Sequence, residues 1–164
     1  MRTRRPPHLT HFDYTGYHRY SLTFCTDRRK PLFTGRRAVE LVLSQIARAA
    51  SEQDFAVIAY CFMPDHLHLV VHGQSEAADC KQFITRAKQY SAYYYSKDLG
   101  GKLWQRYGYE RTLRHEEDTT AAVRYIVENP LRAKLVTCVD EYPFVGSLVC
   151  ELKELLLSLP ARSG

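Results

Sequence analysis

The chain has 164 residues, of which 45% are hydrophobic, 12% aromatic and 25% charged. This composition is typical of one globular domain, and it excludes collagen-like, low-complexity and intrinsically disordered chains. No apolar run approaches the roughly 20 residues of a membrane-spanning helix, and no apolar stretch follows the basic N-terminus as in a signal peptide. The five cysteines include no CxxC pair, which favours reduced, mostly buried thiols over a zinc site or disulfide framework. We therefore expect a cytoplasmic protein without a membrane partner.

Basic side chains are concentrated in two blocks of a chain whose net charge is +5. Residues 1–37 hold nine basic and two acidic side chains, residues 81–114 hold eight and two, and the remainder is acidic. The second block also alternates its cations with tyrosines and one tryptophan. Because cations bind phosphates and aromatic rings stack on unpaired bases, this pattern predicts a nucleic-acid-binding face.

The hydrophobic pattern predicts a single domain over residues 16–149, between a flexible basic arm (1–15) and a C-terminal helix and tail (150–164). Strands are predicted at 17–26, 55–63, 66–72 and 106–114, where apolar residues alternate or form β-branched and aromatic runs. Helices are predicted at 36–52, 77–98, 118–129 and 150–159, where apolar residues recur at helical spacing. The short break between the second and third strands makes them an antiparallel hairpin.

The order of the first six elements is that of the ferredoxin-like arrangement. We therefore predict an α+β fold, ferredoxin-like or RRM-like, with an antiparallel sheet, two helices on one face and an added helix towards the C-terminus that carries Tyr125. Asp118 or Thr119 is the expected N-cap of this added helix. Asn129-Pro130 should end the helix, because the residue before proline disfavours the α region. A loop is predicted over 130–149.

His66 and His68 are the sharpest local feature of the sequence. Side chains at i and i+2 of a strand leave on the same face, so two imidazoles at this spacing can chelate one divalent ion. The alternative is two ordinary polar residues on the open face of a sheet. A second feature is Tyr125 with Asn129, which share a helix face at i and i+4. A phenol can attack phosphorus and an amide oxygen is a hard metal ligand, although helical tyrosines usually serve packing.

Several stretches of the chain resemble one known family. Residues 60–71, YCFMPDHLHLVV, look like the HUH segment of the single-tyrosine transposases, in which two histidines flank a bulky apolar residue. Five further stretches are similar to the REP-associated tyrosine transposases in particular: 29–33, 104–106, 111–114, 123–136 and 141–144. The resemblance spans about residues 17–147, and the combination in this order is far more specific than either motif alone.

The resemblance implies a site, a chemistry and a partner. His66, His68 and Asn129 fall on the family's metal ligands, and Tyr125 falls on its nucleophile. The implied enzyme is a metal-dependent tyrosine transposase that binds, nicks and rejoins single-stranded or hairpin DNA at palindromic repeats through a 5′-phosphotyrosine. The expected cofactor is Mg²⁺ or Mn²⁺, with no small-molecule cofactor. The protein is expected to be a monomer or a homodimer, and to associate with the nucleoid when it binds DNA.

The DNA-binding candidates come from the two basic blocks. Arg2, Arg4 and Arg5 of the arm could enter a groove of a hairpin stem. The candidates of the second block are Lys81, Arg86, Lys88, Trp104, Arg106, Arg111 and Arg114. Most of them would hold phosphates, whereas Trp104 either stacks on a base or lies in the core.

Three alternatives stay open at this point. Tyr94 is a rival nucleophile, because Asp98 lies four residues after it and could be a ligand. The protein could be a non-catalytic RRM-like nucleic-acid-binding protein that stacks bases on its central strands. It could also be a metal-dependent phosphodiesterase that uses a bound water in place of Tyr125.

Overall fold

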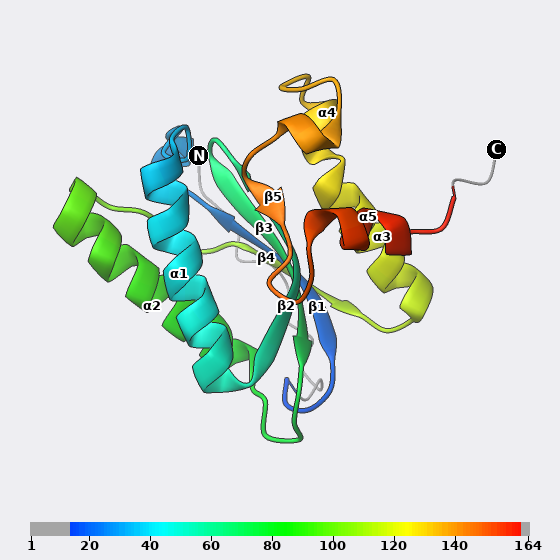
Figure 1. The fold of residues 1–164 in the computed structure, drawn as a ribbon. Helices are drawn as coiled ribbons and strands as arrows, with labels where there is room; N and C mark the ends of the chain where they lie inside the picture. The colour runs from blue at the N-terminus through cyan, green and yellow to red at the C-terminus, as the bar shows by residue number, and fades with distance from the viewer. Residues whose placement is uncertain (1–13, 162–164) are drawn as a thin grey trace.

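The computed structural model describes residues 14–161, and its centre is a five-stranded antiparallel sheet (Figure 1). The strands lie in the order β4-β1-β3-β2-β5. Their bounds are β1 Arg19–Cys25, β2 Phe55–Met63, β3 His66–Gly73, β4 Tyr109–Leu113 and β5 Val145–Gly146. Because β1 to β4 pair in the ferredoxin-like order, with a helix after β1 and another after β3, the predicted fold class is confirmed.

Helices cover both faces of this sheet. Figure 1 shows α1 and α2 on one side of the strands, and α3 and α5 on the other. The bounds are α1 Arg36–Gln53, α2 Cys80–Leu99, α3 Glu116–Val127, α4 Asn129–Arg132 and α5 Leu152–Ser158, with 3₁₀ turns at Asp27–Arg29 and Val139–Glu141. Within residues 14–161, no helix has the length and apolar character needed to cross a membrane.

Each face of the sheet has its own hydrophobic core, because successive side chains of a strand point to opposite faces. On β3, Leu67 and Leu69 belong to the core beneath α1 and α2. Val70 belongs to the second core, which packs against α3 and α5. His66 and His68 lie at even spacing from Val70, so they share the face that α3 covers. All five cysteines are free, and three of them are buried: Cys25, Cys61 and Cys80.

The region between α3 and α5 is more ordered than the sequence predicts. The predicted loop over 130–149 contains most of α4, a 3₁₀ turn and β5. Strand β5 has only two residues, so no periodicity announces it, and it forms by pairing with the edge of β2. Pro130 stands in the first turn of α4, where a missing N–H is tolerated. The helix before it therefore ends at Val127, but a further helical turn follows.

The start of α3 also differs from the prediction. The N-cap is His115, and neither Asp118 nor Thr119 takes that position. Asp118 is instead the third residue of the helix, and its carboxylate accepts a hydrogen bond from the backbone N–H of His115 at 3.3 Å. A carboxylate at the third position of a helix accepts hydrogen bonds from the free backbone N–H groups of the first turn, as an N-cap side chain does. This similarity explains why Asp118 was predicted as the N-cap.

Candidate active site

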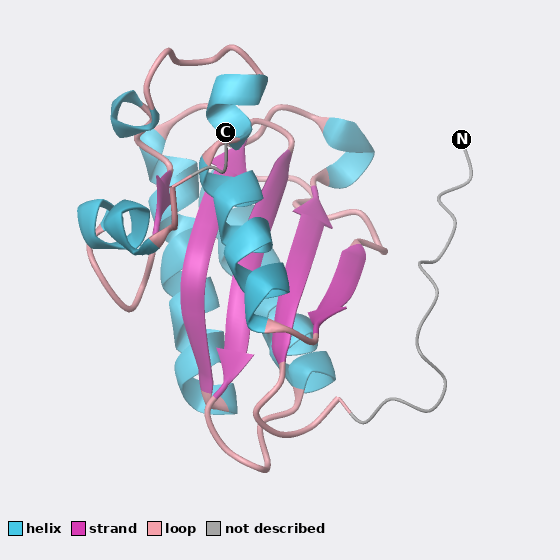
Figure 2. Ribbon diagram, turned by 90° about the vertical axis from the view of Figure 1, so that its right-hand side faces the viewer, coloured by secondary structure: helices cyan, strands magenta, loops and turns pink. Residues whose placement is uncertain are grey.

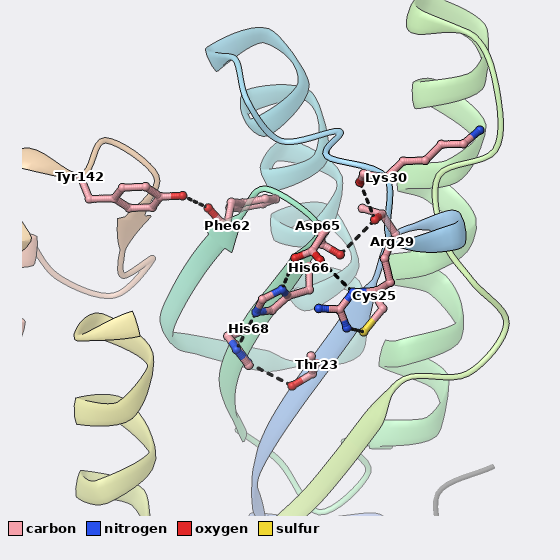
Figure 3. Close-up of polar contacts among 10 residues, drawn as sticks. Thr23, Cys25, Arg29, Lys30, Phe62, Asp65, His66, His68 and Tyr142 are labelled. Atoms are coloured by element: carbon pink, nitrogen blue, oxygen red, sulfur yellow. Dashed lines mark hydrogen bonds and ion pairs between the residues drawn. The ribbon is translucent and has the colours of Figure 1, made fainter. Parts of the chain in front are cut away.

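The two predicted metal-binding histidines lie side by side on β3 (Figure 3). Nε2 of His66 is 3.1 Å from Nε2 of His68. Two adjacent ligands at about 2.1 Å from one ion are about 3.0 Å apart in octahedral geometry and about 3.4 Å apart in tetrahedral geometry. The separation of the two nitrogens therefore fits a shared divalent ion.

Each histidine is held through its other ring nitrogen. Nδ1 of His66 donates to Oδ1 of Asp65 at 2.7 Å, since an ionised carboxylate can only accept. Oδ2 of Asp65 accepts a second hydrogen bond, from Nε of Arg29 at 2.9 Å. Nδ1 of His68 lies 3.0 Å from the hydroxyl of Thr23, which can donate or accept and so suits either tautomer. Such outer partners fix ring orientation in histidine metal sites, and here they leave both Nε2 atoms facing each other.

Local electrostatics keep the pair suited to a cation. Burial lowers the pKa of His68 to about 4, and electrostatic interactions with His66, Arg132 and Arg29 act in the same direction. His68 is therefore neutral at neutral pH and keeps a lone pair for coordination. Burial disfavours ionisation of Asp65, but hydrogen bonds from His66 and Arg29 outweigh it and lower the pKa of this carboxyl. The site thus places an ionised carboxylate behind a pair of imidazoles.

Tyr125 lies on α3 beside the histidine pair. Its neighbours Ile126 and Val127 are buried against the sheet, so Tyr125 stands on the flank of the helix and is 55% exposed. Its ring meets that of His68 edge-on, with the centroids 6.0 Å apart. The guanidinium carbon of Arg132 lies 3.9 Å from the centroid of the same ring, and this side chain also donates to the backbone oxygen of Tyr125. The phenol ring is therefore held between an imidazole and a cation.

Asn129, the predicted third metal ligand, is half-buried at the start of α4. Within the described part of the chain, no hydrogen bond joins its amide to either histidine. Over the same residues, no group of three or more His, Cys, Asp or Glu side chains is placed to hold a metal ion. The structure therefore brings His66, His68 and Tyr125 together, and a ligand set that includes Asn129 stays a prediction.

The predicted phosphate-binding residues are spread over α2, the loop after it and β4. Lys81, Lys88 and Arg106 line one cavity of about 290 Å³ between α2 and the strands β1 and β4. Lys88 is half-buried there, and burial lowers its pKa. The other described candidates are exposed: Arg86, Arg111 and Arg114. Arg2, Arg4 and Arg5 lie outside the described residues.

Trp104 is a core residue, so of the two places predicted for it the structure shows the core and not a surface where a base could stack. It is 5% exposed, and its ring centroid is 5.6 Å from those of Phe24 and Phe33. Its indole N–H donates to the hydroxyl of Ser91 at 2.9 Å. A ring enclosed in this way has no free face for a base. The residues around Trp104 show neither a helix nor a strand pattern of apolar residues, so its burial in the core could not be read from the sequence.

Tyr94, the rival nucleophile, lies on α2 and is separated from the histidine pair by the sheet. Its ring packs edge-on against that of Tyr93, with the centroids 5.1 Å apart. Together with Asp98 it borders a hollow that is lined by residues of α1 and α2. Tyr125 is therefore the tyrosine that the fold places at the histidines.

Comparison with known families supports this assignment. A family model described as "Transposase IS200 like" matches residues 15–129, more than half of the chain. The chain belongs to the IS200-like transposase family. The matched segment runs from before β1 to the first residue of α4, so it includes both histidines, Tyr125 and Asn129.

Two proteins similar to this chain are REP-associated tyrosine transposases, which confirms the resemblance found in the sequence. A Haemophilus influenzae protein assigned to this group is 24% identical over 109 residues, which are 55% of this chain and 57% of that protein, so the match spans little more than half of its length. A solved structure of such a transposase bound to a REP hairpin has a TM-score of 0.74 at 18% identity, covering 96% of this chain and 92% of that chain.

A further solved structure has a similar fold at a lower TM-score. It is a crystal structure of a Deinococcus radiodurans protein assigned as a transposase, with a TM-score of 0.51 at 22% identity. It covers 79% of this chain and 97% of that chain. At these identities the likeness to both structures establishes the fold of this IS200-like transposase.

Three residues of the site are absent from the sequence prediction: Thr23, Asp65 and Arg132. Asp65 directly precedes His66, so its position was a signal that sequence reasoning could have used. Thr23 meets His68 only because the register of β1 and β3 pairs them. Arg132 reaches Tyr125 only because α4 continues the helical path beyond Glu128.

Proposed function

We propose that this IS200-like transposase nicks and rejoins single-stranded DNA at palindromic repeats that fold as hairpins. The observation that carries the proposal is the position of Tyr125, whose ring meets His68 while Nε2 of His68 faces Nε2 of His66. A phenol beside two imidazoles whose Nε2 atoms face each other suits metal-assisted attack on phosphorus.

His66 and His68 would hold a divalent ion, with Asn129 as the candidate third ligand. Imidazole and amide ligands together suit Mg²⁺ or Mn²⁺ and leave positions for a substrate. When bound, such an ion neutralises charge on the scissile phosphate and polarises phosphorus. Asp65 and Thr23 would keep the two rings in the orientation that coordination needs.

In the proposed step, the phenolic oxygen of Tyr125 attacks the scissile phosphorus and the bond from phosphorus to the 3′-oxygen breaks. The phenol gives its proton to solvent, and the departing 3′-oxygen takes one up. The products are a free 3′-hydroxyl and a 5′-phosphotyrosine link. Because the link conserves the bond, attack by a 3′-hydroxyl in the reverse direction rejoins strands without ATP. One tyrosine forms one link at a time, so cutting both ends of a segment needs two molecules or two rounds.

Arg132 would support this step in two ways. Its stacking on the Tyr125 ring and its hydrogen bond to the Tyr125 carbonyl hold the nucleophile in place. Its charge is also close enough to the histidines to lower the pKa of His68, so it lies where a phosphate would arrive. A planar guanidinium is well suited to both tasks.

A hairpin substrate is supported by charge and by likeness. The similar solved transposase is bound to a REP hairpin, and the present chain carries a cavity lined by Lys81, Lys88 and Arg106. The strand must be unpaired at the scissile phosphate, because Tyr125 needs in-line access to phosphorus. In the proposed complex, the protein binds the paired stem of the hairpin and cuts the unpaired strand beside it.

The proposal is tested by covalent trapping. The protein is incubated with labelled hairpin DNA from the repeats that flank its own gene, with Mn²⁺ or with EDTA, and run on denaturing gels. We expect a metal-dependent protein–DNA adduct that Tyr125→Phe abolishes and Tyr94→Phe leaves intact.

Other outcomes of the trapping experiment point to other functions. Cleavage without an adduct, surviving Tyr125→Phe, would indicate a phosphodiesterase that uses water. Binding without cleavage in the presence of metal would leave a non-catalytic RRM-like nucleic-acid-binding protein. An adduct lost in Tyr94→Phe would move the active site to α2.

A further inference from the structure

Within residues 14–161, no helix lies over a strip of the sheet beside the active site. Figure 2 shows α3 crossing in front of the middle of the sheet, with two strands beyond it at the edge opposite β5. These strands are β1 and β4. On the face that carries the histidines, their outward side chains are Arg19, Ser21 and Thr23 on β1, and Tyr109 and Arg111 on β4. Helix α3 reaches this edge only at the end of β4, where Leu113 is buried and Arg111 lies 3.8 Å from the carboxylate of Asp118.

The strand register connects this strip directly to the histidine pair. Tyr109 pairs with Thr23, and Thr23 pairs with His68, so the three side chains form one row across the sheet. With neighbouring strands about 4.8 Å apart, the Cα atoms of Tyr109 and His68 are about 10 Å apart. Arg111 lies two residues further along β4, on the same face. The row therefore leads from the reaction centre to an aromatic ring and then to a cation.

Tyr109 is held close to β1 and presents its ring to solvent. It is 59% exposed. Gly108 before it has no side chain, and a Cβ there would lie only 2.2 Å from the carbonyl oxygen of Thr23. The close approach of β4 to β1 at this point thus depends on glycine. Tyr109 also borders the cavity that Lys81, Lys88, Arg106 and Glu110 line towards α2, so cations lie on the α2 side of β4 as well as at Arg111.

An exposed ring next to cations is the combination that binds unpaired nucleotides. A base stacks on the face of a tyrosine, and a neighbouring arginine binds the phosphate. A base-paired stem offers no free base face, so the strip suits an unpaired strand. Tyr93 is as exposed, at 61%, but it lies on α2 on the other side of the sheet and its ring packs against Tyr94. Tyr93 therefore serves as a control for Tyr109, because it is equally exposed but does not belong to the row of side chains that leads to the histidines.

We infer that the β1–β4 strip binds the unpaired DNA that flanks the scissile phosphate, with Tyr109 stacked on a base and Arg111 on an adjoining phosphate. The inference rests on the proposed function, since it assigns one part of that substrate to one surface. It makes Tyr109 a substrate-binding residue that sets where the strand lies relative to Tyr125.

The test measures DNA affinity in the Tyr125→Phe background, so that no strand is cut. Fluorescence anisotropy compares a hairpin that carries its unpaired flank with the same hairpin without it. Loss of one base-stacking contact predicts that Tyr109→Leu weakens binding of the flanked hairpin about 5- to 150-fold. The blunt hairpin should bind as before, and Tyr109→Phe should retain most of the affinity because the ring remains. Tyr93→Leu is the matched control and should change neither affinity.

Arg111 is tested through the salt dependence of binding. Arg111→Gln should reduce the slope of log K against log salt by about 0.7, the value for one phosphate of a single strand. Arg36 is the matched control. Its side chain is 71% exposed and lies 3.6 Å from the carboxylate of Glu40, whereas the Arg111 side chain is 69% exposed and lies 3.8 Å from that of Asp118. Arg36→Gln should leave the slope unchanged.

The outcomes separate this inference from the proposed function. Equal affinity of wild-type and Tyr109→Leu for the flanked hairpin would overturn the inference, even if wild-type protein forms the adduct. Equal weakening of flanked and blunt hairpins would overturn it too, and would assign the strip to the stem. Absence of any metal-dependent adduct from wild-type protein would instead count against the proposed function.

Discussion

Asp65 offers a sharp test of how the histidine pair is held. Its carboxylate accepts a hydrogen bond from Nδ1 of His66 at 2.7 Å and another from Arg29 at 2.9 Å. Asp65→Ala frees the His66 ring to rotate and leaves the charge of Arg29 unpaired near the cation site. Loss of such an outer partner lowers metal affinity about 10- to 100-fold, or about 1.4 to 2.7 kcal/mol. Asp65→Asn keeps an acceptor oxygen, so its effect should be near the lower end.

The assay is Mn²⁺ titration of the folded protein by isothermal calorimetry. Glu40→Ala removes an exposed carboxylate from α1 and serves as the control, because it changes the net charge equally without contacting the histidines. Thermal unfolding without metal checks that each variant is folded. Mn²⁺ affinity of Asp65→Ala within twofold of wild type would refute the idea that Asp65 orients His66. Failure of wild-type protein to bind Mn²⁺ at all would refute the metal site itself.

Three further predictions concern the nucleophile and the two cores. Arg132→Gln should slow formation of the Tyr125 adduct about 10- to 100-fold in single-turnover gel assays, with Arg132→Lys intermediate, and an unchanged rate would remove Arg132 from the mechanism. Trp104→Phe should lower the free energy of unfolding by about 1 to 3 kcal/mol in urea titrations, since it deletes buried ring atoms and a hydrogen bond. Hairpin affinity of this variant should stay within twofold, and a larger loss would return Trp104 to the DNA interface. Tyr142→Phe removes a buried hydroxyl that donates to the backbone of β2, so it should cost about 0.5 to 1.5 kcal/mol, and no change in denaturation would contradict that bond.

The elements with strong periodicity were predictable from the chain. Strand β2 has the bounds predicted for it, and β3 extends its prediction by one residue. Strand β2 is a long run of apolar and aromatic residues, and β3 alternates histidines with buried leucines, so both carry a clear strand signal. Helices α1 and α2 each carry an apolar stripe that is buried in the core between them and the sheet. Local preference and tertiary packing agree in these segments, and the sequence alone was enough.

Segments whose structure depends on contacts with distant parts of the chain were not predictable in this way. Strand β5 exists because the edge of β2 offers it hydrogen bonds, and two residues carry no pattern. The interior place of Trp104 depends on aromatic rings from β1 and from the loop before α1. In each case the deciding neighbour is distant in sequence, so no local rule could reveal it.

The candidate site also has features that the sequence predicts and features that depend on tertiary packing. The amino-acid pattern alone showed that His66 and His68 share one face, because the period of a strand is two. It also predicted Tyr125 on a helix and, through the family's motifs, indicated its chemistry. Three features depend on tertiary packing: α3 crosses the histidine face, Thr23 reaches His68, and Arg132 stacks on Tyr125. A period follows from the local backbone geometry, whereas the site is assembled from elements that long-range packing brings together.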